Sequence, residues 1–453
     1  MKRRDVMKHL ALGTAAGATG ILGRQGEALS ETYSKATRGL PPLKITNVKA
    51  ILTAPLKTSF MPFVIVKVET SEPGLYGLGC ASLYFRPLAV MTVIEKYMND
   101  FAKGKDPDNI EDIWQCAYVS TNWRNGPVLN NAMSGLDMAL WDIKGKRANM
   151  PVYQLLGGKS RFAVSCYTST SGRDFAELED GVHKIIERGY RVVKIQMGGG
   201  PYKQGLNPPF KNAGFGKKSD VYKNQNSYIT IVPKMFEYIR NKFGDEIEFL
   251  HDMVYERIQP IDAINVIKQL EPYRPFFIED PFTAEDKGYY KLLRAQTSCP
   301  IAFGEEFSNP NNWEDIISGR LIDFIRCHLS YIGGLTPAIK LARFCEWFNV
   351  RTAWHGPNDN SPVGHAAQAH LDLAVWNFGI QEFRQRSELE HEIYPGCPTF
   401  KKDKDGNGYL YVNEAPGLGI DINEKLAAKY PLPEEHSSWW NRKRQADGTI
   451  IRQ

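Results

Sequence analysis

The sequence predicts an α/β protein, a barrel of alternating strands and helices that follows a smaller α+β domain. Three acidic residues supply the first observation: Asp252 follows EFLH, Glu279 follows PFFI and Glu305 follows PIAFG, each an apolar strand-like run. They stand 27 and 26 residues apart, with helical patterns between them. A strand, its crossover helix and the next parallel strand need about thirty residues. Length is the second observation, because 453 residues exceed the roughly 250 of one barrel.

The first 40 residues are expected to be an export signal and a linker. Arg3 and Arg4 precede a short apolar stretch rich in glycine, which is typical of a twin-arginine signal with cleavage near Ala28 to Ser30. The stretch is shorter than the roughly 20 apolar residues of a membrane span. We therefore expect a folded, periplasmic protein with no membrane anchor after signal removal. A disordered basic tail is the alternative.

Residues 44–155 are predicted to form the α+β domain. LKITNVKAILTAP, FMPFVIVKVET and GLYGLGCAS have strand patterns, and three helical patterns follow them. Strands that precede a run of helices indicate an α+β arrangement. Pro151 and the segment LLGGKSR mark the junction with the next domain.

Residues 160–390 are predicted to form the barrel, because strands and helices alternate there. The eight expected strands are FAVSCYTS, RVVKIQM, EIEFLHD, PFFIEDP, PIAFGEE, LIDFIRCHL, VRTAWHG and NFGIQE. The carboxyl ends of parallel strands converge on one rim, so the three acids are predicted to meet there as hard oxygen ligands for Mg²⁺. Helix capping by each acid is the alternative. Residues 391–453 are predicted to return to the first domain.

Composition excludes some functions. The net charge of +5 is spread along the chain without a basic stripe, so we expect no nucleic-acid partner. Seven cysteines without a CxxC pair indicate free thiols.

Residues 403–414 match a calcium-loop pattern, but the flanking residues indicate a hairpin and not the two helices that such a loop needs.

One long insertion, residues 198–228, has no periodicity and is rich in Gly, Asn and Lys. A loop of this length is usually a lid or a substrate loop. We expect at least one of Tyr202, Phe215 and Tyr222 to point into the barrel mouth. A disordered surface insertion is the alternative.

The motifs together resemble the enolase superfamily, from about Leu43 to the C-terminus. The three acids, FFIEDP, DMALWDIKGK before PVYQLLGG, and Gly333-Gly334 carry this resemblance. WHGPND, NFGIQE and EAPGLGIDI are similar to the mannonate-dehydratase-like subgroup of acid-sugar dehydratases, which includes starvation-sensing homologues.

The resemblance implies a modified (β/α)7β TIM-type barrel under an N-terminal capping domain, with one Mg²⁺ per subunit on the three acids. It implies abstraction of the proton α to a carboxylate, an enediolate stabilised by the metal, and loss of the β-hydroxyl to give a 2-keto-3-deoxy sugar acid. An acid-sugar substrate and a homo-oligomer are expected. A racemase or epimerase, and a non-catalytic sugar-acid binding or sensing homologue, are the alternatives.

The acid and base positions differ from the subgroup pattern. Strand two of the subgroup ends in Arg-x-Gln, and here it ends in Lys194-Ile195-Gln196. Lys194 is the base candidate, with an ion pair to a barrel carboxylate as the alternative. His355 is the candidate general acid or donor to the substrate. Tyr255 stands where the subgroup has a histidine, and is the third catalytic candidate.

Four further residues are predicted to contact the substrate: Gln196, Glu382, Asp359 and Arg124. A racemase-like aspartate–histidine pair would need an acid near position 328, where this chain has His328.

Overall fold

The computed structural model describes residues 40–56, 61–197, 221–222, 225–253, 258–433, 443–444 and 449. The chain divides into two compact units, Met1–Lys44 and Ile45–Gln453. The first unit lies almost entirely outside the described residues, so the fold below is that of the second. Among the helices in the described ranges, none has the length and apolar character of a membrane span.

The N-terminal domain consists of an antiparallel sheet covered by helices, as predicted. Its strands pair in the order β1–β2–β3. Their bounds are Ile45–Thr53, Phe63–Thr70 and Tyr76–Cys80. The helices that follow are α2 (Pro87–Val93), a π-helical turn (Ile94–Met98), α3 (Asn99–Ala102), α4 (Ile110–Val119), α5 (Pro127–Ala148) and α6 (Val152–Leu155).

Helix α5 lies very close to this sheet because two glycines remove side chains from the contact. A Cβ on Gly79 of β3 would stand 2.0 Å from the carbonyl oxygen of Gly135 in α5. A Cβ on Gly135 would stand 2.2 Å from a methyl carbon of Val66 in β2. Backbone therefore meets backbone here, which fixes the position of α5 on the sheet.

The second domain is a closed parallel barrel, and each of the eight predicted strands is present. The strands are β4 (Val164–Gly172), β5 (Val192–Met197), β7 (Glu248–Asp252), β8 (Ile278–Glu279), β9 (Ile301–Phe303), β10 (Phe324–Ile325), β11 (Arg351–Thr352) and β12 (Gln381–Glu382). Each pairs in parallel with the next from β4 to β11, and β12 pairs with β4. A bridge between Thr352 and Phe378 completes the ring between β11 and β12.

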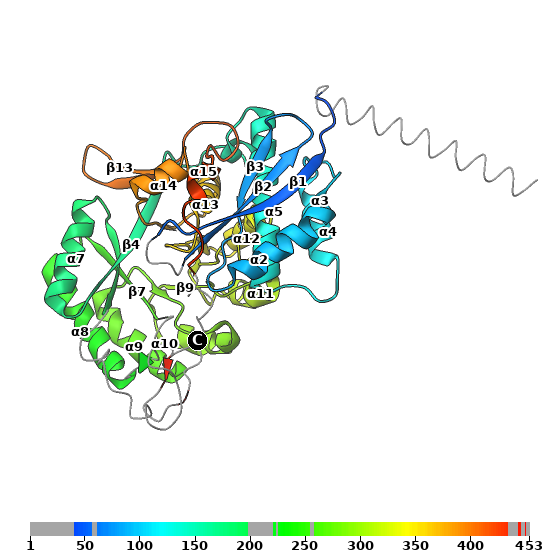
Figure 1. Ribbon diagram of the computed structural model, residues 1–453. Helices are drawn as coiled ribbons and strands as arrows, with labels where there is room; N and C mark the ends of the chain where they lie inside the picture. Colours follow the sequence, from blue (N-terminus) through cyan, green and yellow to red (C-terminus); the bar gives the residue numbers. More distant parts are fainter. Residues whose placement is uncertain are drawn as a thin grey trace, which may run out of the picture. The chain divides into compact units, whose positions relative to one another are not determined.

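Within the described part of the barrel, seven main helices connect these strands, which gives the (β/α)7β arrangement. They are α7 (Phe175–Glu187), α8 (Gln225–Phe243), α9 (Pro260–Leu270), α10 (Tyr290–Gln296), α11 (Pro310–Ser318), α12 (Leu335–Glu346) and α13 (Pro362–Ala374). Figure 1 shows α7, α8 and α9 on the outside of strands β4 and β7. Short 3₁₀ turns, Glu271–Tyr273 and Ala284–Tyr289, precede β8 and α10.

An apolar layer fills the interior of the barrel. It takes buried side chains from seven of the eight strands or their flanking residues, and Val192 of β5 packs against it. The seven are Tyr167, Leu250, Phe277, Ala302, Phe324, Ala353 and Ile380. Because successive side chains of a strand alternate between faces, the residue two positions further along points into the same interior. The residues two positions beyond this layer therefore form the next layer, toward the carboxyl ends of the strands.

The C-terminal segment contacts both domains. Strands β13 (Thr399–Lys402) and β14 (Gly408–Tyr411) form an antiparallel hairpin that pairs with β4. The calcium-loop motif, residues 403–414, begins in the turn of this hairpin and continues through β14, so the hairpin interpretation is confirmed. After α14 (Glu388–Ile393) and the hairpin, α15 (Glu424–Ala427) reaches the first sheet, where Glu424 forms ion pairs with Lys49 and Lys67 at 2.9 and 2.7 Å.

The seven cysteines are free thiols, as predicted, and all except Cys116 are buried.

Candidate active site

The layer above the apolar interior is charged, and strand alternation places its members. Lys194 follows Val192 by two residues, Asp252 follows Leu250, and Glu279 follows Phe277. The same step leads to Arg326, His355 and Glu382 on the last three strands. All six are buried. The sequence therefore brings six polar side chains to one level of one closed barrel, at the carboxyl ends of its strands.

Lys194 lies at the centre of three carboxylates. Its Nζ donates to Glu382 Oε1 at 2.6 Å and to Glu279 Oε2 at 3.0 Å, and stands 3.4 Å from Asp252 Oδ2. Burial alone would lower the pKa of Lys194, but Glu279, Glu382 and Asp252 together raise it well above its ordinary value. Lys194 is therefore an ammonium group in this arrangement. The ion pairs that were the alternative interpretation of Lys194 are present.

A second cation, Arg326, comes directly after β10 and contacts three carboxylates of the cluster. Its guanidinium donates to Glu305 Oε2 at 2.8 Å and to Glu382 Oε2 at 2.7 Å, and its Nε stands 3.2 Å from Glu279 Oε1. The hydroxyl of Tyr167 also donates to Glu279. Neither Arg326 nor Tyr167 was among the predicted site residues, although an arginine inside the apolar run LIDFIRCHL was a visible signal.

The two predicted ligands Asp252 and Glu279 are register partners on β7 and β8. Glu305 comes just after β9, and Arg326 connects it to Glu279. The backbone amides of Gly304 and Glu305 donate to Asp280 Oδ1, which fixes the start of this loop. The structure thus brings the three acids to one rim. The metal–oxygen distances of about 2.0–2.6 Å expected for a divalent ion stay a prediction.

The charge balance of this rim fits a divalent cation. Five carboxylates (Asp252, Glu279, Asp280, Glu305 and Glu382) contact the two cations Lys194 and Arg326. Burial raises the pKa of Asp280 to about 7. Burial and the charge of Asp280 raise the pKa of Glu305 well above its ordinary value. Five carboxylates beside two cations leave a surplus of negative charge, which a cation with hard oxygen ligands would neutralise.

His355 lies beside the acid rim, at the end of β11. Its Nε2 stands 3.5 Å from Glu305 Oε2, and its Nδ1 stands 3.9 Å from Asp359 Oδ2. Burial lowers the pKa of His355 well below its ordinary value, although Asp359 opposes the shift. His328 stands 3.8 Å from the same Asp359 oxygen. Among the described residues, His328, His355 and Asp359 are the group whose possible metal-ligand atoms all lie within 4.8 Å of one another.

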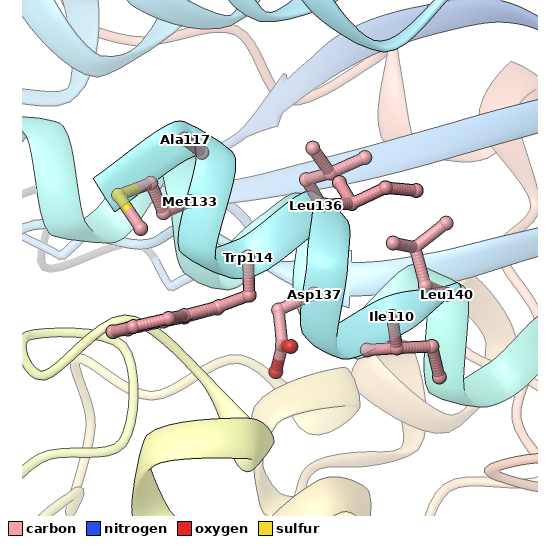
Figure 2. Close-up of a pocket in the computed structure, with 8 residues that line it drawn as sticks. Ile110, Trp114, Ala117, Met133, Leu136, Asp137 and Leu140 are labelled. Carbon is pink, nitrogen blue, oxygen red and sulfur yellow. The ribbon is translucent and has the colours of Figure 1, made fainter. Parts of the chain in front are cut away.

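The capping domain contacts the rim through α5. The Asn130 side chain donates to the carbonyls of Ser308 and Tyr331, in the loops after β9 and β10, at 2.6 and 2.8 Å. Asp137 accepts from the Thr336 backbone amide at 2.9 Å, at the start of α12. Figure 2 shows the Asp137 carboxylate pointing from α5 toward α12, beside Trp114. The cap is therefore joined to the loops that carry the site.

A close approach at Gly334 makes the second of these cap contacts possible. Gly334 has φ = 108°, and a Cβ there would stand 2.5 Å from Asp137 Oδ2. The Gly333-Gly334 pair that contributed to the resemblance thus has a local physical reason. Only glycine adopts this φ without strain and leaves room for the Asp137 carboxylate.

The remaining predicted site residues lie away from the ion-pair cluster or outside the described residues. Gln196 is two residues beyond Lys194 on β5 and half-buried. Arg124 is exposed between α4 and α5, where its guanidinium stacks on the Tyr118 ring at 5.2 Å, and it has no contact with the rim within the described part of the chain. Tyr255 lies outside the described residues. So does the predicted lid apart from β6 (Val221–Tyr222), which pairs with β15 (Lys443–Arg444), and from the start of α8.

The barrel, the acidic rim with a buried lysine and histidine, and the domain that covers the rim define a class of enzyme that does acid–base chemistry at a barrel mouth. Residues 43–157 match the family described as mandelate racemase / muconate lactonizing enzyme, N-terminal domain. Residues 177–426 match the enolase C-terminal domain-like family. The chain therefore belongs to the enolase superfamily, and this prediction is confirmed.

Similar proteins narrow the assignment. A D-galactonate dehydratase family member of Musicola paradisiaca is 51% identical over 423 residues, which cover 90% of this chain and 99% of the relative. The family member RspA of Pantoea ananatis is 50% identical with the same coverage. A solved enolase of Pantoea ananatis, described with bound D-gluconate and Mg, is 49% identical with a TM-score of 0.82 and covers 91% of this chain and 100% of its own. The chain is thus an enzyme of a dehydratase family.

Proposed function

We propose that this enzyme dehydrates an acid sugar with a free carboxylate, of the gluconate, galactonate or mannonate type, to a 2-keto-3-deoxy sugar acid. The observation that carries the proposal is the rim itself, where three strand-end acids lie beside Lys194 and His355. The similarity to the Pantoea ananatis enolase with bound D-gluconate and Mg supports the substrate class. The enzyme is a Mg²⁺-dependent hydro-lyase.

Asp252, Glu279 and Glu305 would hold the Mg²⁺. They offer hard oxygen donors, and Glu305, with 14% of its side chain exposed, opens toward the mouth. When bound there, the ion supplies positive charge that stabilises the negative charge developing on the substrate carboxylate as its α-proton leaves. Without such charge, an α-proton beside a carboxylate is far too weakly acidic for a side-chain base.

Lys194 is the proposed base. Its Nζ faces the rim from β5, and two of the three carboxylates that keep it protonated, Asp252 and Glu279, are among those that would bind the cation. Neutralising these carboxylates favours the neutral amine, which can then accept the α-proton. Glu382 remains between Lys194 and Arg326, which together hold its pKa below its ordinary value against the effect of burial. It stays a carboxylate and can accept from a sugar hydroxyl.

His355 is the proposed group that gives a proton to the departing β-hydroxyl. The ring stands between Glu305 and Asp359, on the same rim as Lys194. A proton held at Nε2 would leave with the hydroxyl as water, while Lys194 takes the α-proton. The enol that remains would become the keto acid by gaining a proton at the β-carbon and losing its hydroxyl proton. The proton on Lys194 would return to solvent as His355 takes one up, so that one water is lost per turnover. Asp359 and Glu382 can bind further hydroxyls of the sugar acid.

Product analysis tests the proposal. We would incubate the Mg²⁺-loaded enzyme in D₂O with D-gluconate, D-galactonate and D-mannonate, and follow both keto-acid formation and deuterium at the α-carbon. Keto acid that disappears with a chelator supports the dehydratase. Deuterium exchange without keto acid would support the racemase or epimerase alternative. Binding without either would support a sugar-acid binding or sensing protein. A Glu279→Gln variant, which removes one carboxylate of the rim, is the matched negative control.

We further propose that the protein is exported to the periplasm in a folded state and assembles as a homo-oligomer. Arg3 and Arg4 ahead of an apolar stretch support the export. An Arg3→Lys, Arg4→Lys double variant should stay in the cytoplasm of a cell that exports the wild type, as fractionation would measure. Light scattering of the purified protein measures the oligomer, and a monomeric mass would contradict that part.

A further inference from the structure

Asp359 is the focus of three side chains that the proposed reaction does not explain together. The Tyr331 hydroxyl donates to Asp359 Oδ2 at 3.1 Å. His328 Nε2 and His355 Nδ1 stand 3.8 and 3.9 Å from the same oxygen. Among the described residues neither of these two ring nitrogens has a hydrogen-bond partner, although both are buried. Distances of this kind commonly shorten when the substrate binds and a site tightens.

The tautomer of His328 follows from its backbone contact. The Ser330 amide donates to His328 Nδ1 at 3.1 Å, so this nitrogen carries no proton. Burial lowers the pKa of His328 to about 3, so the ring is neutral. The single ring proton of His328 is therefore on Nε2, the atom that faces Asp359. The Tyr331 ring stacks on His328 with centroids 4.2 Å apart, which fixes the plane of the imidazole.

Two strand ends bring these groups together. His328, just after β10, and His355, just after β11, form a parallel bridge, and the His355 amide donates to the Cys327 carbonyl at 3.1 Å. The acid of a racemase-like pair would stand near position 328. In this chain the acid stands at 359 instead, and position 328 provides a donor to it.

We propose that His328 is a positioning residue: with Tyr331 it orients the Asp359 carboxylate, which in turn holds the His355 ring with Nδ1–H toward Asp359 and Nε2 toward the acid rim. The inference rests on the proposed function: with Nδ1–H held by Asp359, the lone pair of His355 is at Nε2. This nitrogen takes up the proton that it then gives to the β-hydroxyl, while Asp359 stabilises the imidazolium formed in between. Neutral His328 also leaves the negative charge of Asp359 available to His355. A protonated His328 would compensate that charge itself.

A second metal ion at His328, His355 and Asp359 is the competing interpretation, because these three could form a ligand group. A neutral histidine ligand needs a free lone pair on the nitrogen that binds the metal. His328 uses its only lone pair to accept the Ser330 amide, and presents a proton at the centre of the group. The backbone contact therefore favours a donor over a ligand.

The test compares His328→Phe, which keeps the stacked ring but removes the donor, with His328→Gln, which can restore an N–H at the Nε2 position. Loss of one such donor is expected to lower kcat about tenfold with little change in KM, and His328→Gln should recover most of it. His370→Phe is the matched control, since His370 is equally buried and stacks on Tyr153 with centroids 5.6 Å apart, away from the rim.

A second readout does not depend on turnover. ¹⁵N-histidine NMR of the Mg²⁺-loaded, substrate-free enzyme, with His355→Gln for assignment, reports which His355 nitrogen is protonated. We expect a single Nδ1–H tautomer in the wild type and a mixture in His328→Phe. If the spectra show the expected tautomers but no acid sugar is dehydrated, the proposed function is wrong, whereas the positioning role of His328 is still supported.

Three results would overturn the inference. One is wild-type kcat together with an unchanged His355 spectrum in His328→Phe. Another is an equal loss of activity in His370→Phe, or no recovery in His328→Gln, which would make His328 a packing residue. The third is one equivalent of Zn²⁺ that binds to the Mg²⁺-loaded wild type and not to His328→Phe. If His328→Phe does not fold, Tyr331→Phe carries the same comparison.

Discussion

Replacing Lys194 by methionine removes the cation that three buried carboxylates share. Its Nζ lies 2.6, 3.0 and 3.4 Å from oxygens of Glu382, Glu279 and Asp252. Methionine has a similar length and fits an apolar environment, so the variant tests charge more than shape. In the metal-free variant, Arg326 still pairs with Glu382. Less positive charge then remains beside Glu279 and Asp252.

The expected loss follows from these distances. At an effective dielectric constant of about 20, three such attractions sum to on the order of 15 kcal/mol, most of which offsets the cost of burying the ammonium. Breaking one buried pair typically costs about 3–5 kcal/mol. We expect Lys194→Met to lower the metal-free stability by that amount near pH 8. The loss should shrink as the pH falls, because the abandoned carboxylates become protonated.

Mg²⁺ should reverse most of this loss. The Lys194 ammonium and the ion compete for oxygens of Asp252 and Glu279. The variant should therefore bind Mg²⁺ more tightly than the wild type. Binding at a hundred times the dissociation constant stabilises a protein by about 2.7 kcal/mol. Thermal and denaturant unfolding with Mg²⁺ and with a chelator measure both effects, and calorimetry measures the affinity. With acid sugar in D₂O, deuterium exchange at the α-carbon should be lost.

Lys146→Met is the matched control, because Lys146 pairs at 2.7 Å with the buried Asp142 in the cap. Its loss of stability should not depend on Mg²⁺. Unchanged metal-free stability in Lys194→Met would refute the electrostatic reasoning. Loss of Mg²⁺ binding would assign Lys194 a structural role in holding the acids. Near wild-type deuterium exchange would move the base to Tyr255, His355 or a lid tyrosine.

Two further predictions concern the cap. Burial raises the pKa of Asp137 to about 7. From pH 4 to 7 the folded state therefore binds a proton that the unfolded state releases, and stability falls as pH rises. In denaturant unfolding, the free energy of unfolding of Asp137→Asn should equal that of the wild type near pH 4 and exceed it by up to about 4 kcal/mol at pH 8. A difference in stability that does not depend on pH would instead indicate that Asp137 is ionised in the folded state and stabilises the start of α12. Gly79→Ala places a methyl group 2.0 Å from the Gly135 carbonyl and should cost more than about 3 kcal/mol in the same assay, whereas a loss below 1 kcal/mol would contradict the close packing of α5.

The barrel was predictable because its signals are local. Each acid follows its own strand, and one repeat length separates them, so the sequence indicated both the strand ends and their common rim. The alternation of side chains then accounts for Lys194 and Glu382 at the same level. The family comparisons confirm the class of enzyme that these motifs suggested.

The contacts within the site were less predictable because they depend on distance across the ring. Arg326 reaches carboxylates that come from β8, from the loop after β9 and from β12, and no spacing in the sequence reports that reach. The group around Asp359 depends on the bridge between two strand ends. Arg124 was predicted to contact the substrate, but the fold leaves it exposed on Tyr118.

The two layers inside the barrel have opposite effects on stability. The apolar layer from Tyr167 to Ile380 stabilises the closed ring through burial. The charged layer two residues further along buries carboxylates beside Lys194 and Arg326, and an apolar layer of equal volume would often be as stable or more so. The charged layer lies at the carboxyl ends of the strands, which is where the chemistry of such barrels takes place. Because Glu279 pairs with both Lys194 and Arg326, at 3.0 and 3.2 Å, a cation bound by Glu279 would weaken one ion pair of each residue. Cation binding and the protonation state of Lys194 are therefore coupled by the geometry of the rim.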